Sequence, residues 1–373
     1  MRSLVGALLT LIALSATVGC GKTSESVGRG SSGPGGGSED AGGGAVRRDG
    51  ATRPVVHDAA MNDMNDTGAV ADDIPAPSCM GLPAHCGASN AESCCRSPVV
   101  KGGTFIRHYD GGAFTNSSYT ATLNDFRLDR FDVTVGRFRA FVSAYSQDMI
   151  APGTGKNPHN PSDPGWDPTW NAKLPADRMA LTAGVTCIFN TWMDTPGIWE
   201  NHPINCVTWY EAFAFCIWDG GRLPSEAEWN YAAAGGSEQR AYPWSKPPSS
   251  THVDCTYADY MGAKGGTDYC VNPLPGFGDT NDVGSESPKG DGRWGQADLA
   301  GNLIQWTLDW YRPSPPPLTC FDCADTTPAA GSRMIRGGSY RNAAATLLSS
   351  VTNDSADPTD RMGVLGFRCA RSP

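Results

Sequence analysis

Apolar residues recur at helical spacing in the segment that follows Thr134. Three or four residues separate the main members of this set, so one face of a helix carries all of them. The set consists of Val135, Phe138, Phe141, Val142 and Tyr145. The spacing predicts a helix that opens at Thr134 and turns this stripe toward the core.

Two further helices are marked by their first residues. Thr208 and Glu211 have the spacing of a capping box, in which each side chain accepts a hydrogen bond from the other residue's backbone N–H. The same pattern recurs at Ser225 and Glu228. Glycine is common just after the last turn of a helix, so we expect both helices to end at glycine pairs. These pairs lie at residues 220–221 and 235–236.

Alternating apolar and polar residues predict strands in residues 101–110 and 124–134. In the second segment, Phe126 and Leu128 share one face. Residues 242–330 are rich in Gly, Pro, Asp and Trp, which predicts long, ordered loops. Helical patterns are few, and Trp, Tyr, Phe and Gly are plentiful. This favours a loop-rich α+β body over a helical bundle or a doubly wound sheet.

The N-terminal residues 1–20, MRSLVGALLTLIALSATVGC, have the pattern of an export signal. Their end, ATVGC, resembles a bacterial lipobox, in which the cysteine, here Cys20, is lipidated and becomes the new N-terminus. Gly21 follows instead of an aspartate that would favour retention at the inner membrane. We therefore expect an exported lipoprotein of the cell envelope, anchored in the outer membrane. A plain secretory signal with a coincidental cysteine is the alternative.

Residues 21–77 contain mostly Gly, Ser, Asp, Ala and Pro and almost no large apolar side chains. Such a segment buries too little apolar surface to offset the entropy lost on ordering. It is expected to be a flexible tether between the anchor and the body. The chain carries a net charge of −10 and lacks an extended basic run. This argues against nucleic acid as a partner, and it leaves the N-terminal lipid as the expected membrane contact.

The thirteen cysteines leave an even number once Cys20 is assigned to the lipid. In an exported chain, twelve cysteines predict six disulfides. Four of them lie in CMGLPAHCGASNAESCC, residues 79–95. A zinc site usually uses paired C-x-x-C knuckles, so two local disulfides are preferred to zinc. Residues 78–98 are therefore expected to be a small cysteine-rich neck.

Five segments, in this order along the chain, resemble the formylglycine-generating enzymes, also called sulfatase-modifying factors. They are HPINCVTWYEAFAFCIWDGGRLPSEAEWNYAAAGG (202–236), YPWSK (242–246), GQADLAGNLIQWTLDWY (295–311), RGGSYRN (336–342) and LGFRCAR (365–371). The resemblance spans residues 99–373. It implies one domain with a variant of the C-type lectin fold, low in regular secondary structure and stabilised by disulfides.

Active members of this family oxidise a cysteine in a sulfatase peptide to formylglycine. The resemblance implies O2 and a copper ion held by two cysteines just after the GGSY loop. The matching positions here are Asn342 and Leu347. Leucine has no donor atom, and an amide is a poor ligand for Cu(I), which prefers sulfur. Copper and the family's oxidation are therefore not expected, and the loop residues Ser339 and Tyr340 remain as part of an old substrate groove.

The resemblance also implies one disulfide, between Cys216 and Cys369. A second family disulfide would join Ala233 and Thr352 and is absent. The remaining cysteines then suggest three local pairs: Cys187 with Cys206, Cys255 with Cys270, and Cys320 with Cys323. The last pair, in CFDC, also fits a redox C-x-x-C. A structural disulfide is preferred because no βαβ pattern surrounds it.

Calcium is the other ligand that the resemblance implies, in the segment DLAGNLIQW. The candidate ligands are Asp298, Gly301, Asn302 and Gln305. Gln305 replaces the family's glutamate, so it keeps an oxygen but loses the charge. A hydrogen-bonded turn is the alternative to calcium. A second calcium site is expected in residues 256–269 or 278–284, without assigned ligands.

Two further features have alternative explanations. Arg222 and Glu226 have the spacing of a catalytic charge pair, but a structural ion pair at a helix start is preferred. Four tryptophans lie among Pro, Asn and Asp and are either a stacking surface for sugars or peptides or anchors of loops. They are Trp166, Trp170, Trp192 and Trp199.

The favoured function is therefore a surface binding or scaffold protein that holds a protein, peptide or glycan. The alternative is an oxidoreductase of the formylglycine-generating type that acts on a cysteine-containing protein through a non-standard metal site. A structural part of an envelope assembly is a third hypothesis. The six histidines show no metal-ligand spacing, which favours the binding hypothesis.

Overall fold

Short strands and four α-helices make up the regular part of the described chain. The computed structural model describes residues 73–83, 85–111, 115–262, 269–271, 279–312, 319–327, 331–342, 349–350 and 353–373. The helices are α1 (Val135–Ala144), α2 (Arg178–Gly184), α3 (Trp209–Trp218) and α4 (Glu226–Ala233). Three 3₁₀ turns are η1 (Pro77–Cys79), η2 (Pro168–Lys173) and η3 (Gly236–Glu238). None of the described helices is long and apolar enough to cross a membrane.

The strands form three small sheets in the described chain. Their bounds are β1 (Val99–Val100), β2 (Gly103–Ile106), β3 (Thr120–Leu123), β4 (Phe126–Leu128), β5 (Ile304–Trp310), β6 (Thr319–Phe321), β7 (Arg333–Arg336), β8 (Asn353–Ala356), β9 (Leu365–Gly366) and β10 (Ala370–Arg371). The sheet orders are β1-β4-β10, β2-β3-β6 and β8-β7-β5-β9. Pairs β5–β7 and β7–β8 are antiparallel, and β5–β9 is parallel. The α+β, loop-rich fold class is confirmed.

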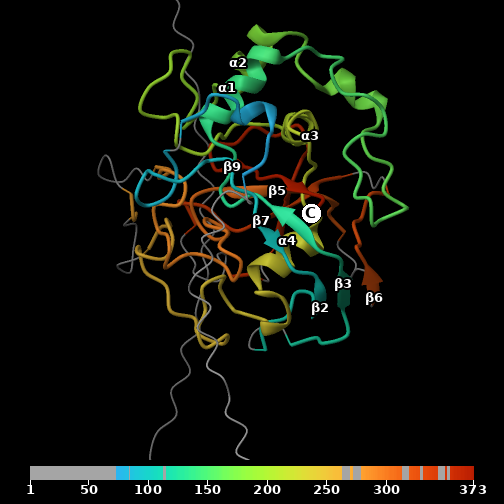
Figure 1. Ribbon diagram of the computed structural model, residues 1–373, viewed down its shortest axis with the longest axis vertical. Helices are drawn as coiled ribbons and strands as arrows, with labels where there is room; N and C mark the ends of the chain where they lie inside the picture. The colour runs from blue at the N-terminus through green and yellow to red at the C-terminus, as the bar shows by residue number, and fades with distance from the viewer. Residues whose placement is uncertain are drawn as a thin grey trace, which may run out of the picture. The chain divides into compact units, whose positions relative to one another are not determined.

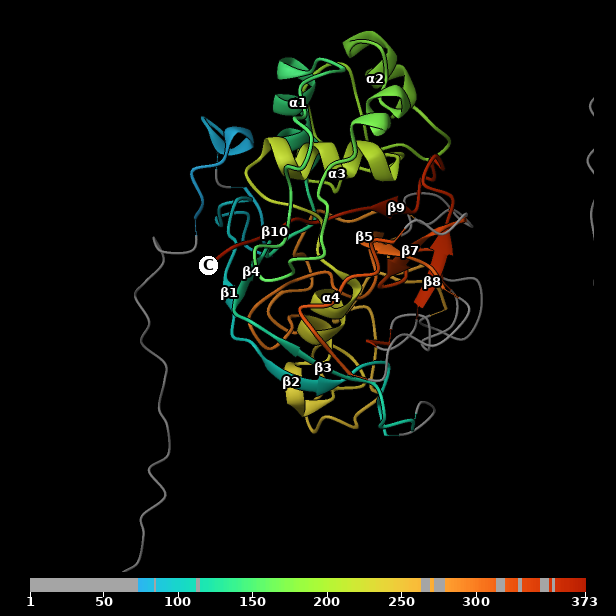
Figure 2. The ribbon, with the colours of Figure 1, turned by 90° about the vertical axis from the view of Figure 1, so that its right-hand side faces the viewer.

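Figures 1 and 2 show how these elements are layered. Helices α1, α2 and α3 gather at one end, and β2 and β3 lie at the other. The four-stranded sheet and α4 lie between them. Because β5 and β9 come from distant parts of the chain, the sheet joins the segments that carry the family motifs.

The predicted helix starts are confirmed. The Thr134 side chain accepts a hydrogen bond from the Arg137 backbone and caps α1. Both capping boxes are formed, at the starts of α3 and α4. Gly235 has φ 65°, in the left-handed region that glycine adopts at little cost. Helix α2 was not predicted, because it has seven residues and buries only Leu181.

The predicted second strand is shorter in the structure than in the sequence pattern. Only β4 forms, and Phe126 and Leu128 are both buried. Beyond it, backbone pairing continues at single points, from Asp129 to Cys369 and from Val133 to Phe367. The chain leaves the sheet because α1 begins directly afterwards.

A cluster of aromatic rings forms the largest part of the core. Phe138 of α1 stacks on Phe215 of α3, with ring centroids 5.8 Å apart and planes at 17°. Phe215 also meets Phe367 edge-on at 5.4 Å. Trp166 and Trp192 are buried in the same cluster, and Trp170 packs against it. These three tryptophans therefore anchor loops, as the alternative interpretation held, and Trp199 contacts His202 at 4.4 Å.

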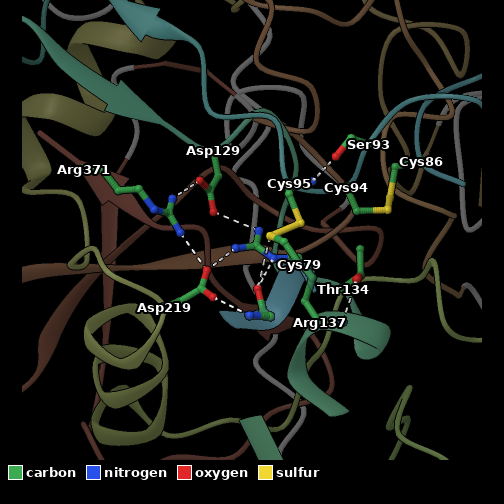
Figure 3. The surroundings of a disulfide bond; sticks show 11 residues. Cys79, Cys86, Ser93, Cys94, Cys95, Asp129, Thr134, Arg137, Asp219 and Arg371 are labelled. Atoms are coloured by element: carbon green, nitrogen blue, oxygen red, sulfur yellow. Dashed lines mark hydrogen bonds and ion pairs between the residues drawn. A yellow bond between two sulfur atoms is a disulfide. The ribbon is translucent and has the colours of Figure 1, made fainter. Parts of the chain in front are cut away.

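The cysteine-rich segment forms the two expected local disulfides, Cys79–Cys95 and Cys86–Cys94 (Figure 3). It does not stand apart from the body. The Ser78 backbone N–H donates to Asp219 at 2.9 Å, and Arg137 donates to the Ser78 hydroxyl at 3.0 Å. The described structure begins at Asp73, before residue 77, where the tether was expected to end. Asp73 forms an isolated antiparallel backbone bridge with Arg96. The segment therefore packs against the body, and Cys86 and Cys94 share a buried cluster with Phe131.

The other four predicted disulfides form as well. Cys216–Cys369 joins α3 to the residue that precedes β10, across 153 positions of sequence. Cys320–Cys323 lies at β6 and closes a three-residue separation. Every cysteine of the described residues is paired, so no described thiol is available to bind a metal.

Candidate functional site

The GGSY loop follows β7 and turns sharply through two glycines. Gly337 and Gly338 have φ values of 99° and 68°, which favour glycine. A Cβ on Gly337 would lie 3.0 Å from the Leu299 carbonyl oxygen, so a side chain there would crowd the neighbouring backbone. The loop therefore requires glycine for both conformation and space.

Ser339 and Tyr340 follow and are each only 1% exposed. The Tyr340 N–H donates to the Asn302 carbonyl at 3.0 Å, and its hydroxyl donates to the Gly363 carbonyl at 3.4 Å. Burial raises the pKa of Tyr340 to about 12. Both residues were expected to line an open groove. They instead hold the loop against its neighbours, because their polar groups bond inward.

Asn342 closes this loop. Its side-chain oxygen accepts hydrogen bonds from the Ser339 backbone N–H at 2.5 Å and from the Ser339 hydroxyl at 3.0 Å. Its carbonyl oxygen accepts from the Met261 N–H at 3.2 Å. The amide at the first expected copper position thus has a structural use as a turn cap. Leu347, at the second position, lies outside the described residues.

A cavity of about 780 Å³ opens beside the loop at Arg341, which lies between Tyr340 and Asn342. Residues 186–189 and 361–364 supply most of its other walls. The Arg341 guanidinium lies 4.4 Å from the centre of the Phe189 ring, and Arg341 is exposed. The disulfide Cys187–Cys206 fixes one wall. The sequence predicted the Cys187–Cys206 disulfide but no binding role for residues 186–189, because no motif surrounds them.

Large apolar side chains are exposed around this cavity. Ile188 is 77% exposed and lines the cavity itself, together with Phe189. Met179, Met193 and Ile198 are exposed as well, but they do not line the cavity. Neighbouring exposed apolar residues such as Ile188 and Phe189 mark interaction surfaces more often than isolated ones do.

The four predicted calcium ligands lie within residues 298–305, and side-chain oxygens of three of them, Asp298, Asn302 and Gln305, already accept hydrogen bonds. The Gln305 side-chain oxygen accepts from Trp229 and from Arg368, each at 2.8 Å. One carboxylate oxygen of Asp298 accepts from the Gly284 N–H at 2.7 Å. Gly301 and Asn302 donate their N–H groups to backbone carbonyls of Gly337 and Asp259. Gln305 in particular is unavailable as a ligand in this arrangement.

A more suitable acidic cluster lies next to that turn. Neither carboxylate oxygen of Asp259 has a hydrogen-bond partner of normal geometry among the described residues, although Asp259 is buried. One oxygen of Glu286 is likewise unsatisfied. Burial first, and then the charges of Glu286 and Asp298, raise the pKa of Asp259 well above its usual range; the Val271 backbone partly opposes this. Unneutralised, buried carboxylates of this kind favour a cation.

No three acidic, His or Cys side chains of the described chain lie close enough to hold a metal ion by themselves. A calcium ion near Asp259 would therefore take part of its shell from backbone carbonyls and water, as calcium commonly does. Asp259 lies in residues 256–269, one of the two segments in which the second calcium site is expected, the other being residues 278–284.

The predicted pairing of Arg222 with Glu226 is wrong. Arg222 donates to both carboxylate oxygens of Glu228, at 2.5 and 2.6 Å. Glu226 instead pairs with Arg336 of β7 and lies 3.6 Å from His108. The capping box turns Glu228 back toward the helix start, where Arg222 lies, and leaves Glu226 facing the sheet. Burial alone would raise the pKa of Glu226, but Arg336 and His108 lower it to about 2.

Comparisons with known proteins agree with the motifs. The family described as "Sulfatase-modifying factor enzyme 1-like domain" matches residues 84–373. The formylglycine-generating enzyme of Streptomyces coelicolor is 30% identical over 274 residues, which are 68% of this chain and 80% of that protein. A mouse protein named "Inactive C-alpha-formylglycine-generating enzyme 2" is 26% identical over 299 residues, which are 73% of this chain and 84% of that protein.

Among solved structures, PvdO from Pseudomonas aeruginosa aligns with a TM-score of 0.50 and 20% identity. The alignment covers 78% of this chain and 99% of PvdO. At this identity the likeness bears on the fold alone.

Proposed function

The chain belongs to the sulfatase-modifying factor family, and from this premise we propose that it is a binding or scaffold protein without formylglycine-generating activity. The observation that carries the proposal is Asn342. Its amide oxygen caps the loop through Ser339, at the position where the family resemblance implies a copper-binding cysteine. A relative whose name describes it as inactive adds support.

We propose the cavity beside Arg341 as the binding site, and a peptide segment of a protein as its ligand. Arg341 forms no ion pair with a described carboxylate, so its charge is available to an acidic side chain. Arg361 in the opposite wall already pairs with Glu211 and holds that wall in place. Ile188 and Phe189 offer apolar contact. The ligand should therefore present an acidic residue next to a bulky apolar one.

Selection from a displayed peptide library tests this site. Peptides enriched by the wild-type domain are expected to carry Asp or Glu near a bulky apolar residue. Arg341→Glu should weaken binding of the selected peptides by about ten-fold or more, because a charged contact contributes about 1.5–3 kcal/mol. Arg178→Glu is the control, since Arg178 is an exposed arginine that does not line this cavity. Enrichment that is unchanged by Arg341→Glu would contradict the proposal.

We further propose calcium as a bound structural ion, with Asp259 as a ligand. Calcium should raise the melting temperature, by the equivalent of about 2.7 kcal/mol at one hundred times its Kd. Asp259→Asn should abolish this response and raise the melting temperature in the absence of calcium, because it removes charge repulsion. Asp254→Asn, at a more exposed carboxylate five residues earlier in the chain, should leave the response intact. A full calcium response in Asp259→Asn would contradict the assignment.

The expected anchor remains a proposal. Lipidation of Cys20 and a tether over residues 21–77 would hold the domain outside the membrane surface. Cys20→Ser is expected to move the protein from the envelope membrane fraction to the soluble exported fraction and to abolish labelling with a radioactive fatty acid. Labelling that persists in this variant would rule out Cys20 as the lipidated residue.

A further inference from the structure

A second cavity, of about 590 Å³, lies between residues 240–257 and 288–295. It shares no lining residue with the cavity beside Arg341. Its volume lies within the range of pockets that hold a small molecule or one to two sugar units. The residues that matter for its chemistry are Trp244, Lys246, His252, Tyr257, Lys289 and Arg293.

One wall of this cavity is a fixed row of aromatic rings. Trp244 stacks on Tyr242 at 5.1 Å, and Tyr257 follows at 5.6 Å from Trp244. The Trp244 indole N–H donates to the His252 carbonyl at 2.9 Å, and the His252 ring meets Tyr257 edge-on. Tyr257 is partly exposed, so part of its ring is available to a ligand. The nearby disulfide Cys255–Cys270 limits movement of this wall.

The rest of the lining is basic. Lys246 and Lys289 are exposed, and neither forms an ion pair with a described carboxylate. Lys289 donates to the Thr256 hydroxyl at 3.3 Å, and its ammonium lies 5.8 Å from the centre of the Tyr257 ring. Arg240 and Arg293 share a single carboxylate, that of Glu238.

The acidic residue of the lining, Asp291, is already neutralised by Arg130 at 3.1 Å. Glu238 balances one of the two guanidiniums, and Asp254, which contacts the lining residue His252, adds one more nearby negative charge. With both lysines unbalanced, the described lining keeps an excess of positive charge. The chain as a whole has a net charge of −10. A concave basic site on an acidic protein concentrates the local potential and attracts anions.

We propose that this cavity binds an anionic saccharide, a sugar ring that carries a sulfate or carboxylate group. The apolar C–H face of the ring packs on Tyr257, and the anionic group contacts Lys246 and Lys289. Both parts of the lining are needed, because an aromatic wall alone selects for neutral sugars and a basic rim alone selects for any anion. The site is distinct from the peptide cavity and does not depend on it.

Calorimetric titration with a heparin-derived disaccharide, which carries uronate and sulfate groups, tests the proposal on the whole domain. The disaccharide should bind, and added salt should weaken it. Lys246→Gln/Lys289→Gln should weaken binding by about ten-fold or more, which corresponds to about 1.4 kcal/mol. Tyr257→Leu should weaken it as well. Lys156→Gln/Lys173→Gln removes the same charge from exposed lysines elsewhere and should have little effect. Thermal melting checks that each variant is folded.

Each of the other probes has an outcome that would overturn the proposal. Cellobiose binding as tightly as the disaccharide would overturn the role of charge. Inorganic sulfate binding as tightly would overturn the role of the sugar ring. Binding to anionic phospholipid vesicles, but not to the disaccharide, would assign the cavity to lipid headgroups. Disaccharide binding that is unchanged in Lys246→Gln/Lys289→Gln would show that the disaccharide binds outside this cavity.

Discussion

Replacement of both Cys216 and Cys369 by alanine is expected to lower the free energy of unfolding by about 5 kcal/mol. The disulfide closes a separation of 153 residues, so reduction releases a large loop in the unfolded chain, and the entropic estimate grows with loop length. Both cysteines are also fully buried in the aromatic core, where the loss of two sulfur atoms removes contacts. Urea unfolding followed by tryptophan fluorescence measures the change.

The matched control is Cys320→Ala/Cys323→Ala, which opens a separation of only three residues. The same entropic estimate gives less than about 2 kcal/mol for this pair. Equal losses in the two double variants would contradict the explanation by loop length. Greater loss in the Cys320 variant would show that β6 has a structural role that its contacts do not indicate.

Arg137→Met is expected to lower the free energy of unfolding by about 3–5 kcal/mol at neutral pH. Arg137 is fully buried and donates to Asp129 at 2.9 Å and to Asp219 at 2.6 Å (Figure 3). Arg371 contacts the same two carboxylates, so two guanidiniums balance two carboxylates. Methionine fills much of the space but leaves one buried negative charge uncompensated. Chemical denaturation measures the loss.

The loss should shrink in acid. Burial alone would raise the pKa of Asp129, but Arg371 and Arg137 outweigh it and hold the pKa below its usual range. Stability from such a group is present above its unfolded pKa, about 3.9, and is lost as the pH falls below it. In Arg137→Met this contribution to stability is smaller, so less of it is lost in acid. The difference in the free energy of unfolding between the variant and wild type should therefore become smaller below about pH 4.

Arg139→Met on the same helix is the control, because Arg139 pairs with Glu200 near the surface. Partly exposed pairs contribute about 0–1 kcal/mol. A loss in Arg139→Met as large as that in Arg137→Met would contradict the account of the buried quartet. So would a loss in Arg137→Met that is independent of pH.

Local sequence signals predicted the features that depend on neighbouring residues. The caps at Thr134, Thr208 and Ser225 need only residues three positions away, and all three form. The disulfides also followed, because an even number of cysteines in close pairs leaves few arrangements, and the family resemblance supplied the distant pair. Helix α2 was not predicted, because seven residues with one buried side chain show little apolar periodicity in the sequence.

The features that depend on tertiary contacts were not visible in the sequence. Glu226 and Glu228 have similar spacing from Arg222, and only the packing of α4 against β7 decides which one faces Arg336. The absence of a copper-binding pair was visible, but the use of Asn342 as a cap on Ser339 was not. Arg341 was overlooked because its importance arises from residues 186–189, which meet it only in the fold.

The Cys20 anchor, the calcium ion and the two ligands rest on separate experiments, and the central claim is that this domain binds rather than oxidises. The most direct test incubates the domain with added copper, O2 and a cysteine-containing sulfatase peptide. Mass spectrometry then follows conversion of the thiol to the aldehyde. The Streptomyces coelicolor formylglycine-generating enzyme serves as the positive control. We expect an unchanged peptide with this chain; formylglycine formed at a rate near that of the control would contradict the account.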